Sequence, residues 1–243
     1  MAQISINADM GEALGIHSFG NDLPLMQYVD LVNVAGGFHS GDPDSINATV
    51  SAAHSHQLQI GAHPGLPDLV GFGRRRMAVS PEELRNIIVY QVGAVEAFCR
   101  VNGAALRHLK PHGILYTMLA EDRDLMQVVA ETAHKFELEV LGAPNTLHEE
   151  VCEQAGVRFV PELYVDLDYG DDGRITVQRT PGGRTLASVA DRVRQAVQEG
   201  TVQTVTGKTV PIHFESICVH SDGSQAVDVA RTVAETLTVL GAR

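Results

Sequence analysis

A repeated unit of strand, polar turn and helix constrains the fold of this chain most strongly. It is clearest between residues 31 and 65, where two apolar runs each lead into a histidine, His39 and His63, within a turn rich in glycine and proline. Between them, Asp42 and Pro43 predict a helix that begins at Pro43 with Asp42 as its N-cap. The segment therefore predicts a βαβ unit whose polar side chains follow the carboxyl ends of its strands.

The rest of the chain follows the same plan. Further strands are predicted at 4–6, 31–35, 106–109, 138–142, 157–161 and 216–219, and further helices at 22–28, 81–102, 122–136, 145–155, 186–199 and at the C-terminal end. A β-hairpin is predicted around the turn at 171–173, with 175–177 as a strand, and a second short excursion at 202–212. Roughly seven alternating strand–helix units predict a single α/β domain over residues 1–243, with a closed or nearly closed parallel sheet.

Net charge and cysteine content indicate which partners and which cellular compartment to expect. The net charge of -12 argues against nucleic acid or an acidic membrane surface as a partner, because phosphate binding needs clustered cations. The first residues do not resemble a signal peptide, and no apolar run is long enough to span a bilayer. The 3 cysteines include no Cys-x-x-Cys pair, which favours free thiols in a reducing compartment. We therefore expect a cytoplasmic protein without a nucleic-acid or membrane partner.

Several polar residues fall just after predicted strands. They are Asp9, Glu12, His39, Asp42, His63, Lys110, His112, Glu162, His220 and Asp222. Because the carboxyl ends of the strands of a parallel barrel meet at one rim, we expect these side chains to converge. Four of them are histidines in turns, a pattern that favours a functional site over a structural role.

Some of these residues also have plain structural interpretations. Asp42 is the predicted N-cap of the helix that begins at Pro43, Glu12 can simply face solvent, and Glu162 can pair with a structural arginine. The arginines at 74–76 are typical of a solvated loop. Their functional interpretation is a lid in which Arg74 or Arg75 offers a cation to a substrate carboxylate.

Two kinds of chemistry fit the candidate residues. Asp9 with His39 and His63 could hold a divalent metal, but no short-range His-x-x-x-His pair specifies the ligands, and we leave the metal open. The competing use is acid–base chemistry, in which a carboxylate orients a histidine that activates water while Lys110 stabilises an oxyanion or a phosphate. Residues 207–209 resemble the end of a P-loop, but the upstream glycine is missing, so no common nucleotide-binding motif is present.

Six segments, in this order along nearly the whole chain, resemble the LamB/YcsF family, the A subunit of prokaryotic ATP-dependent 5-oxoprolinase. They are 7–12 (NADMGE), 37–43 (GFHSGDP), 61–65 (GAHPG), 71–75 (GFGRR), 110–116 (KPHGILY) and 218–220 (CVH). Ala8 and Gly36 stand where we expect cysteines, which argues that those thiols are not essential. Leu167 replaces an arginine expected beside Asp166, so we assign no substrate contact there, and the turn at 221–223 is also a variant.

The resemblance implies a seven-stranded parallel β/α barrel of the glycoside hydrolase/deacetylase type. It also implies ring-opening hydrolysis of 5-oxo-L-proline to L-glutamate, with ATP and Mg²⁺ as co-substrate, in a complex with subunits B and C. We assign catalysis to Asp9, His39, His63, Lys110 and His112, and substrate binding to Glu12, Asp42, Arg74, Arg75, Glu162, His220 and Asp222.

The chemistry of a lactam explains a requirement for ATP. A five-membered lactam is a stabilised amide with a poor leaving group, and phosphorylation of its oxygen would make the carbonyl carbon electrophilic. Lys110→Met should then reduce turnover strongly while leaving folding intact. Two alternatives stay open: a metal-dependent deacetylase or amidohydrolase acting on a small amide or sugar, and a protein that binds substrate without catalysing the reaction.

Overall fold

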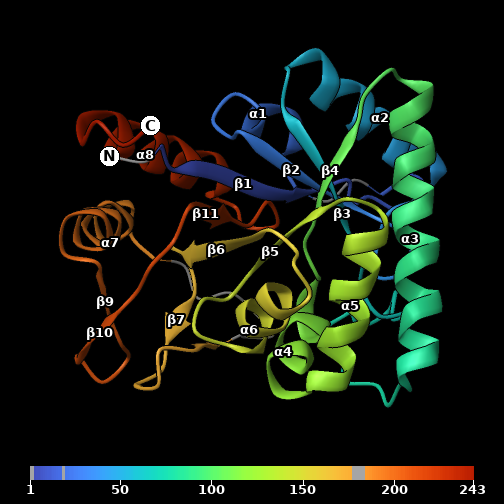
Figure 1. Cartoon of the computed structure of the whole chain (residues 1–243). Helices are drawn as coiled ribbons and strands as arrows, with labels where there is room; N and C mark the ends of the chain where they lie inside the picture. Colours follow the sequence, from blue (N-terminus) through green and yellow to red (C-terminus); the bar gives the residue numbers. More distant parts are fainter. Residues whose placement is uncertain (1–2, 18–19, 177–183) are drawn as a thin grey trace.

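The computed structural model describes residues 3–17, 20–176 and 184–243. Within these ranges, seven parallel strands form a closed barrel in the order β1-β11-β6-β5-β4-β3-β2 (Figure 1). The strands are β1 (Ser5–Met10), β2 (Leu31–Ala35), β3 (Gln59–His63), β4 (Leu106–Leu109), β5 (Glu139–Gly142), β6 (Phe159–Tyr164) and β11 (Ser216–Val219). The predicted seven-stranded β/α barrel is confirmed.

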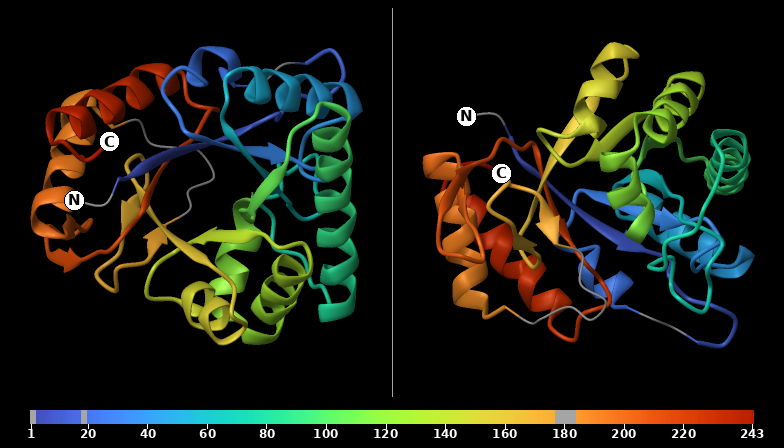
Figure 2. Two further views of the ribbon diagram at one scale, coloured as in Figure 1. Left: turned by 45° about the horizontal axis from the view of Figure 1, so that its top comes forward. Right: turned by 90° about the horizontal axis from the view of Figure 1, so that it is seen from below.

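Helices surround the barrel in sequence order (Figure 2). They are α1 (Asp22–Leu25), α2 (Pro43–Ser55), α3 (Pro81–Val101), α4 (Gly113–Glu121), α5 (Arg123–Lys135), α6 (Leu147–Gln154), α7 (Leu186–Glu199) and α8 (Ala226–Val239). The two ends of the described chain meet, since the backbone N–H of Ile4 donates to the carbonyl of Ala242 at 2.8 Å. Among the described residues, no helix is both long enough and apolar enough to cross a membrane.

Local sequence fixes where two of the helices begin. The Asp42 carboxylate accepts from the backbone N–H groups of Asp44 and Ser45, as predicted for the N-cap of α2. Ser80 and Glu83 form a reciprocal capping box at the start of α3. These caps satisfy N–H groups that have no partner within the helix.

Several elements differ from the sequence predictions. Strand β1 continues to Met10 instead of ending at Ile6, so that Asp9 lies within the strand, and α1 ends at Leu25 instead of residue 28. Helix α4 was not predicted, because residues 113–121 are apolar on most sides and follow a turn without a polar face to mark a helix. Strand β6 continues to Tyr164 instead of ending at Pro161, so that Glu162 lies within the strand.

The two predicted excursions are antiparallel hairpins, β7 (Asp168–Tyr169) with β8 (Ile175–Thr176) and β9 (Thr201–Gln203) with β10 (Thr209–Pro211). Val177, the last residue of the predicted strand at 175–177, lies outside the described residues.

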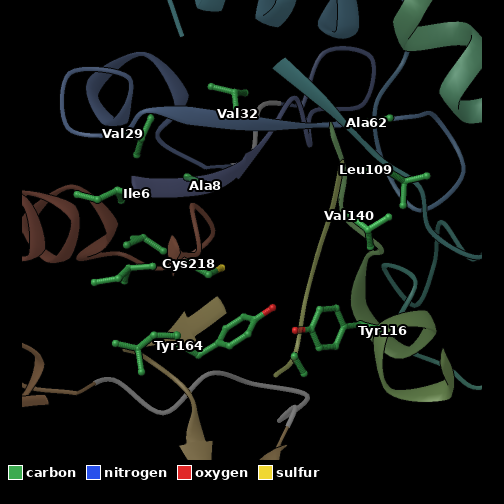
Figure 3. Packing of buried hydrophobic residues seen from close by; sticks show 14 of the residues in the cluster. Ile6, Ala8, Val29, Val32, Ala62, Leu109, Tyr116, Val140, Tyr164 and Cys218 are labelled. Carbon is green, nitrogen blue, oxygen red and sulfur yellow. The ribbon is translucent and has the colours of Figure 1, made fainter. Parts of the chain in front are cut away.

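The strands divide apolar from polar side chains. Residues such as Ile6, Ala8 and Val32 are fully buried in the apolar cluster that includes the surrounding helices (Figure 3). Asn7 and Asp9 alternate with them along β1, and alternate residues of a strand point to opposite faces. They hydrogen-bond across the barrel, so the barrel interior is polar. Full burial of a Val or Ile side chain contributes about 1.5–3 kcal/mol, and the apolar layer between strands and helices supplies the core.

A glycine makes room for one polar side chain in the barrel. A Cβ on Gly61 would lie 2.1 Å from the ring of His108, whose Nε2 is 2.7 Å from the Asn33 side-chain oxygen. We expect Gly61→Ala to lower the free energy of unfolding by about 1–3 kcal/mol, because the interior would be overpacked. Gly93→Ala is the matched control, since a Cβ on Gly93 in α3 would meet no atom within 4 Å.

The control substitution should raise the free energy of unfolding by about 0.5–1 kcal/mol, because alanine favours a helix interior over glycine. Urea denaturation at neutral pH measures both variants. Equal effects of the two substitutions would contradict the packing described for Gly61.

Candidate active site

Lys110 lies at the centre of the polar interior, just after β4, and is only 2% exposed. Its ammonium is 3.0 Å from Asp9 Oδ1, 3.3 Å from Glu162 Oε1 and 2.9 Å from Cys218 Sγ. It also donates to the Asn7 side-chain oxygen at 3.1 Å. Burial opposes the charge, but the acidic neighbours outweigh it and hold the pKa of Lys110 well above its usual value. The lysine is therefore a buried cation shared by three strands.

Glu162 lies within β6 and points into the barrel interior. Its carboxylate is fully buried and accepts from the Asn7 amide at 3.0 Å and the Tyr164 hydroxyl at 3.0 Å. The prediction that Glu162 stands at a strand end was wrong, and its cationic partner is Lys110, not an arginine. Removing Lys110 would take the nearest cation from two buried carboxylates, so we now expect Lys110→Met to lower stability as well as turnover.

Asp9 joins this interior to the rim. Its Oδ1 accepts from Lys110 and from the Asn33 amide at 2.8 Å, and its Oδ2 is 3.4 Å from His63 Nε2 and 4.0 Å from His220 Nε2. Burial would raise the pKa of Asp9, but His63 and Lys110 outweigh burial and hold that pKa well below its usual value. Asp9 is thus a buried, charged carboxylate with one oxygen turned toward two histidines.

A cluster of three histidines and Glu12 lies beside Asp9. The ring of His39 stacks on that of His112, with centroids 3.6 Å apart and an interplanar angle of 7°, while His63 lies nearly perpendicular to both. Glu12 Oε1 is 3.2 Å from His39 Nε2 and 3.5 Å from His112 Nδ1. Burial, together with the nearby charge of Asp9, raises the pKa of Glu12 to about 8. Burial also holds the pKa values of His39 and His112 well below their usual range.

The loop at 71–76 covers this cluster. Gly73 has φ +62°, and a Cβ there would lie 2.8 Å from both His39 and His112, so only glycine fits this approach. The carbonyl of Phe72, which also has a positive φ, accepts from His112 Nε2 at 2.8 Å. Arg74 pairs with Asp222 at 2.8 Å on the opposite side of the pocket. The loop therefore orients a histidine and carries one cation to the rim.

His220 forms the other side of the site. Its Nδ1 is 2.7 Å from Asp166 Oδ2, and its ring stacks on Tyr164 with centroids 5.9 Å apart. Burial disfavours the charged imidazole, but the Asp166 carboxylate outweighs burial and raises the pKa of His220 to about 9. Close to neutral pH, His220 is therefore a cation beside Asp9.

These groups enclose a pocket at the carboxyl ends of the strands. Its wall includes Asp9, Glu12, His63, Arg74, Pro111, Lys110, His112, Tyr116, Tyr164, Leu167, Ile175, His220 and Asp222. The hydroxyls of Tyr116 and Tyr164 point toward one another on one side (Figure 3). Ile175 comes from the β7–β8 hairpin, which places an apolar side chain at the mouth.

Most of the predicted site residues converge, and four do not line the pocket. His39 lies behind His112, Glu162 lies deeper in the barrel, Asp42 caps α2, and Arg75 pairs with Asp68. Asp42 also accepts from the backbone N–H of Gly15 at 2.7 Å. The geometry thus gives these four residues supporting contacts. The roles assigned to the predicted residues in catalysis and binding stay predictions.

Sequence reasoning missed several polar residues of the site. Asn7 stands in the 7–12 segment but was given no role, and Asn33 was not singled out, because an uncharged asparagine within a strand does not by itself indicate a site. Cys218 was considered a free thiol, and the structure places it against Lys110. Asp166 was given no role because its neighbour Leu167 departs from the expected arginine. Tyr116 follows the 110–113 turn, and recognising α4 as a helix would have brought it to the rim.

Two groups of side chains have donor atoms close enough together for a cation, counting only the described parts of the chain. Glu12, His39, His63 and His112 bring their donor atoms within 4.8 Å of one another, as do Asp9, Cys218 and His220. The first group is the predicted combination of imidazole and carboxylate, with Glu12 in the place we expected for Asp9. The second contains a thiol that already contacts Lys110.

The arrangement can bind a small polar molecule and transfer protons. Asp9 and His63 offer acceptors, His220 and Arg74 offer cations, and Lys110 places positive charge under the floor of the pocket. Since these groups lie in a low-dielectric surrounding, charge that develops in the pocket interacts with them more strongly than in water.

The model of the LamB/YcsF family matches residues 4–243. The chain belongs to the LamB/YcsF family. It is 40% identical over 246 residues to a protein of Tolumonas auensis named as the A subunit of 5-oxoprolinase, with 99% of the chain and 98% of the relative covered. A protein of the same name from Bacillus cytotoxicus is 37% identical over 245 residues, with 99% and 97% covered.

Two solved structures support the fold. The lactam utilization protein of Thermus thermophilus is 37% identical, with a TM-score of 0.91 and 98% and 97% of the two chains covered. A protein of Enterococcus faecalis assigned as a cellobiose-phosphate cleavage protein is 14% identical, with a TM-score of 0.60 and with 99% of this chain and 95% of that chain covered. The second similarity shows the barrel fold alone.

The pair of His220 and Asp166 predicts a pH dependence of stability. The pKa of His220 is raised in the folded protein to about 9, above the ordinary value of about 6.5, so its stabilising contribution is complete below about pH 6.5. That contribution is lost as the pH rises through about 9. The difference in unfolding free energy between the wild type and Asp166→Asn should therefore shrink from pH 6 to pH 10.

Urea denaturation across this pH range, with NMR titration of the His220 ring, measures the effect. Asp191→Asn is the control, because it removes an exposed carboxylate paired with Arg194, and arginine does not titrate in this range. A difference for Asp166→Asn that stays constant from pH 6 to pH 10 would show that His220 is not held charged by Asp166.

Proposed function

We propose that this chain is the A subunit of a 5-oxoprolinase and hydrolyses the lactam 5-oxo-L-proline to L-glutamate with ATP. Support comes from full-length similarity to relatives named as the A subunit of 5-oxoprolinase and from the 0.91 TM-score to a lactam utilization protein. The structural observation that carries the proposal is the contact of Asp9 with both Lys110 and His63 on the floor of the pocket.

The pocket suits a small anionic lactam. Its apolar side chains Leu167 and Ile175 fit ring methylenes, and its cations His220 and Arg74 fit the substrate carboxylate. Lys110 lowers the cost of negative charge on the lactam oxygen. These contacts would hold the substrate with its carbonyl carbon above Asp9.

Asp9 supplies the hydrolytic step, with His63 beside it at 3.4 Å. Its carboxylate positions a water and takes the proton as the water oxygen bonds to the carbonyl carbon. The carbon–nitrogen bond of the ring then breaks, and the ring nitrogen takes up a proton to become the amine of glutamate. Phosphorylation of the lactam oxygen by ATP, which releases ADP, activates that carbon first. Breaking the carbon–nitrogen bond then leaves an acyl phosphate, and a second water hydrolyses it to phosphate and the side-chain carboxylate of glutamate.

The ligands for the ATP phosphates come from the partner subunits on this proposal. The candidate segment 207–209 lies in the β9–β10 hairpin, and Lys208 pairs with Asp171 at 2.8 Å. The partners are subunits B and C, Mg²⁺ accompanies ATP, and the assembly works in the cytoplasm. The free, buried cysteines Cys99, Cys152 and Cys218 are compatible with that location.

The test measures glutamate formed from labelled 5-oxo-L-proline with Mg-ATP, first with this chain alone and then with its B and C subunits. We expect glutamate and an equal amount of ADP from the full mixture only. Asp9→Asn in that mixture should lower kcat by about 10²–10⁴, the usual range for loss of a proton-transfer group. Asp228→Asn is the control, since its carboxylate on α8 pairs with Arg231 and does not line the pocket.

Thermal melting and co-purification of the subunits check that both variants fold and assemble. No glutamate from a verified complex would refute this substrate. Amide hydrolysis without ATP by the chain alone would instead favour the deacetylase or amidohydrolase alternative. Unchanged turnover with Asp9→Asn would favour a protein that only binds substrate.

A further inference from the structure

The hydrogen bonds of His63 and His112 fix which nitrogen of each ring carries the proton. His63 Nδ1 is 2.7 Å from the carbonyl of Lys110, and His112 Nε2 is 2.8 Å from the carbonyl of Phe72. A carbonyl only accepts, so both of these nitrogens are protonated donors. In the neutral rings, the other nitrogens, His63 Nε2 and His112 Nδ1, are therefore unprotonated.

These two unprotonated nitrogens face each other at 3.0 Å. Two lone pairs at that distance do not form a hydrogen bond, and both rings are buried away from solvent. A contact of this kind is stable when a positive species lies between the two nitrogens. That species is either a single proton shared by the rings or a metal ion.

Glu12 brings a third donor to the same point. Its Oε1 is 3.5 Å from His112 Nδ1, and its ion-pair contacts among the described residues are with His39 and His112 only. His39 Nδ1 is buried without a hydrogen-bond partner, which is less costly for a lone pair than for an N–H group. His39 Nε2 then carries the proton and donates to Glu12 at 3.2 Å. This contact requires an unprotonated Glu12 oxygen.

We propose that His63 Nε2, His112 Nδ1 and Glu12 Oε1 bind one transition-metal ion, with Zn²⁺ or Mn²⁺ as the probes that fit. The separations of 3.0 and 3.5 Å agree with about 3.3 Å between tetrahedral ligands that lie about 2.0–2.1 Å from one ion. Two imidazoles favour such ions over Mg²⁺ and Ca²⁺, which prefer oxygen ligands.

The surroundings of the three ligands support a metal over a shared proton. Metal-binding histidines usually donate their second ring N–H to a backbone carbonyl or a carboxylate, as His63 and His112 do here. Glu12 is in turn held by His39. The stacked ring of His39 runs parallel to that of His112, so its lone pair does not point to the same place, and we assign it a positioning role.

The ion would lie at the wall of the pocket, because all three ligands line it. Bound there, it would supply positive charge and a Lewis acid close to Asp9. Asp9 Oδ2 is 3.4 Å from His63 Nε2, so this carboxylate would stand directly beside the ion. The proposal goes beyond the proposed function and does not depend on it, because its test measures binding in place of lactam turnover.

The test is equilibrium dialysis of the purified full chain against Zn²⁺ and, separately, Mn²⁺, with the bound metal measured by elemental analysis. We expect about one ion per chain and a higher melting temperature. The double variant His63→Gln/His112→Gln should lose the ion and the temperature shift. His148→Gln is the matched control, since His148 is also buried but lies against Tyr116, outside the cluster.

A second measurement keeps the test decisive where the double variant does not fold. The ¹⁵N signals of the histidine rings in the wild-type chain should show the Nδ1–H form of His63 and the Nε2–H form of His112. Adding Zn²⁺ should shift His63 Nε2 and His112 Nδ1 and leave the His148 nitrogens unchanged. Wild-type protein that binds no stoichiometric metal, or ring signals that do not respond to it, would overturn the proposal.

Discussion

The buried ammonium of Lys110 is the constraint on which the rest of the structure depends. A charge in a protein interior is costly unless it is paired and hydrogen-bonded. Here Asp9, Glu162 and Asn7 supply the partners from β1 and β6, and Cys218 contacts the ammonium from β11. Because strands far apart in the sequence share one cation, their register and the direction of their polar side chains are coupled. The barrel closes around a charge cluster, while its apolar packing lies outside, under the helices.

This arrangement extends outward to the rim. Lys110 fixes one oxygen of Asp9, which leaves the other oxygen facing His63 and His220. The backbone carbonyl of Lys110 also accepts from the ring of His63. Lys110 therefore orients both Asp9 and His63 at the floor of the pocket. The histidine cluster on one side and the ion pair of His220 and Asp166 on the other then give the pocket two different walls. Such preorganised groups need little rearrangement when charge develops on a bound molecule.

Sequence alone predicted the barrel and the convergence at its rim, since β2, β11 and α7 have the bounds that apolar runs and turns indicated. It did not predict depth within the barrel. Glu162 was placed at the rim because its strand was ended too early, and the pair of Asp166 with His220 depends on the register of β6 beside β11. Tautomers and the stacking of His39 on His112 follow from tertiary contacts, which no local pattern records.

The most direct test of the role of Lys110 is the unfolding free energy of Lys110→Met at neutral pH, measured by urea denaturation. Loss of the ammonium removes the cation that Asp9 and Glu162 share in the interior, so we predict a decrease of about 3–5 kcal/mol. Lys135→Met, which removes an exposed lysine at the end of α5, should change stability by less than about 0.5 kcal/mol. A Lys110→Met protein as stable as the wild type would contradict the central place given to this buried cation.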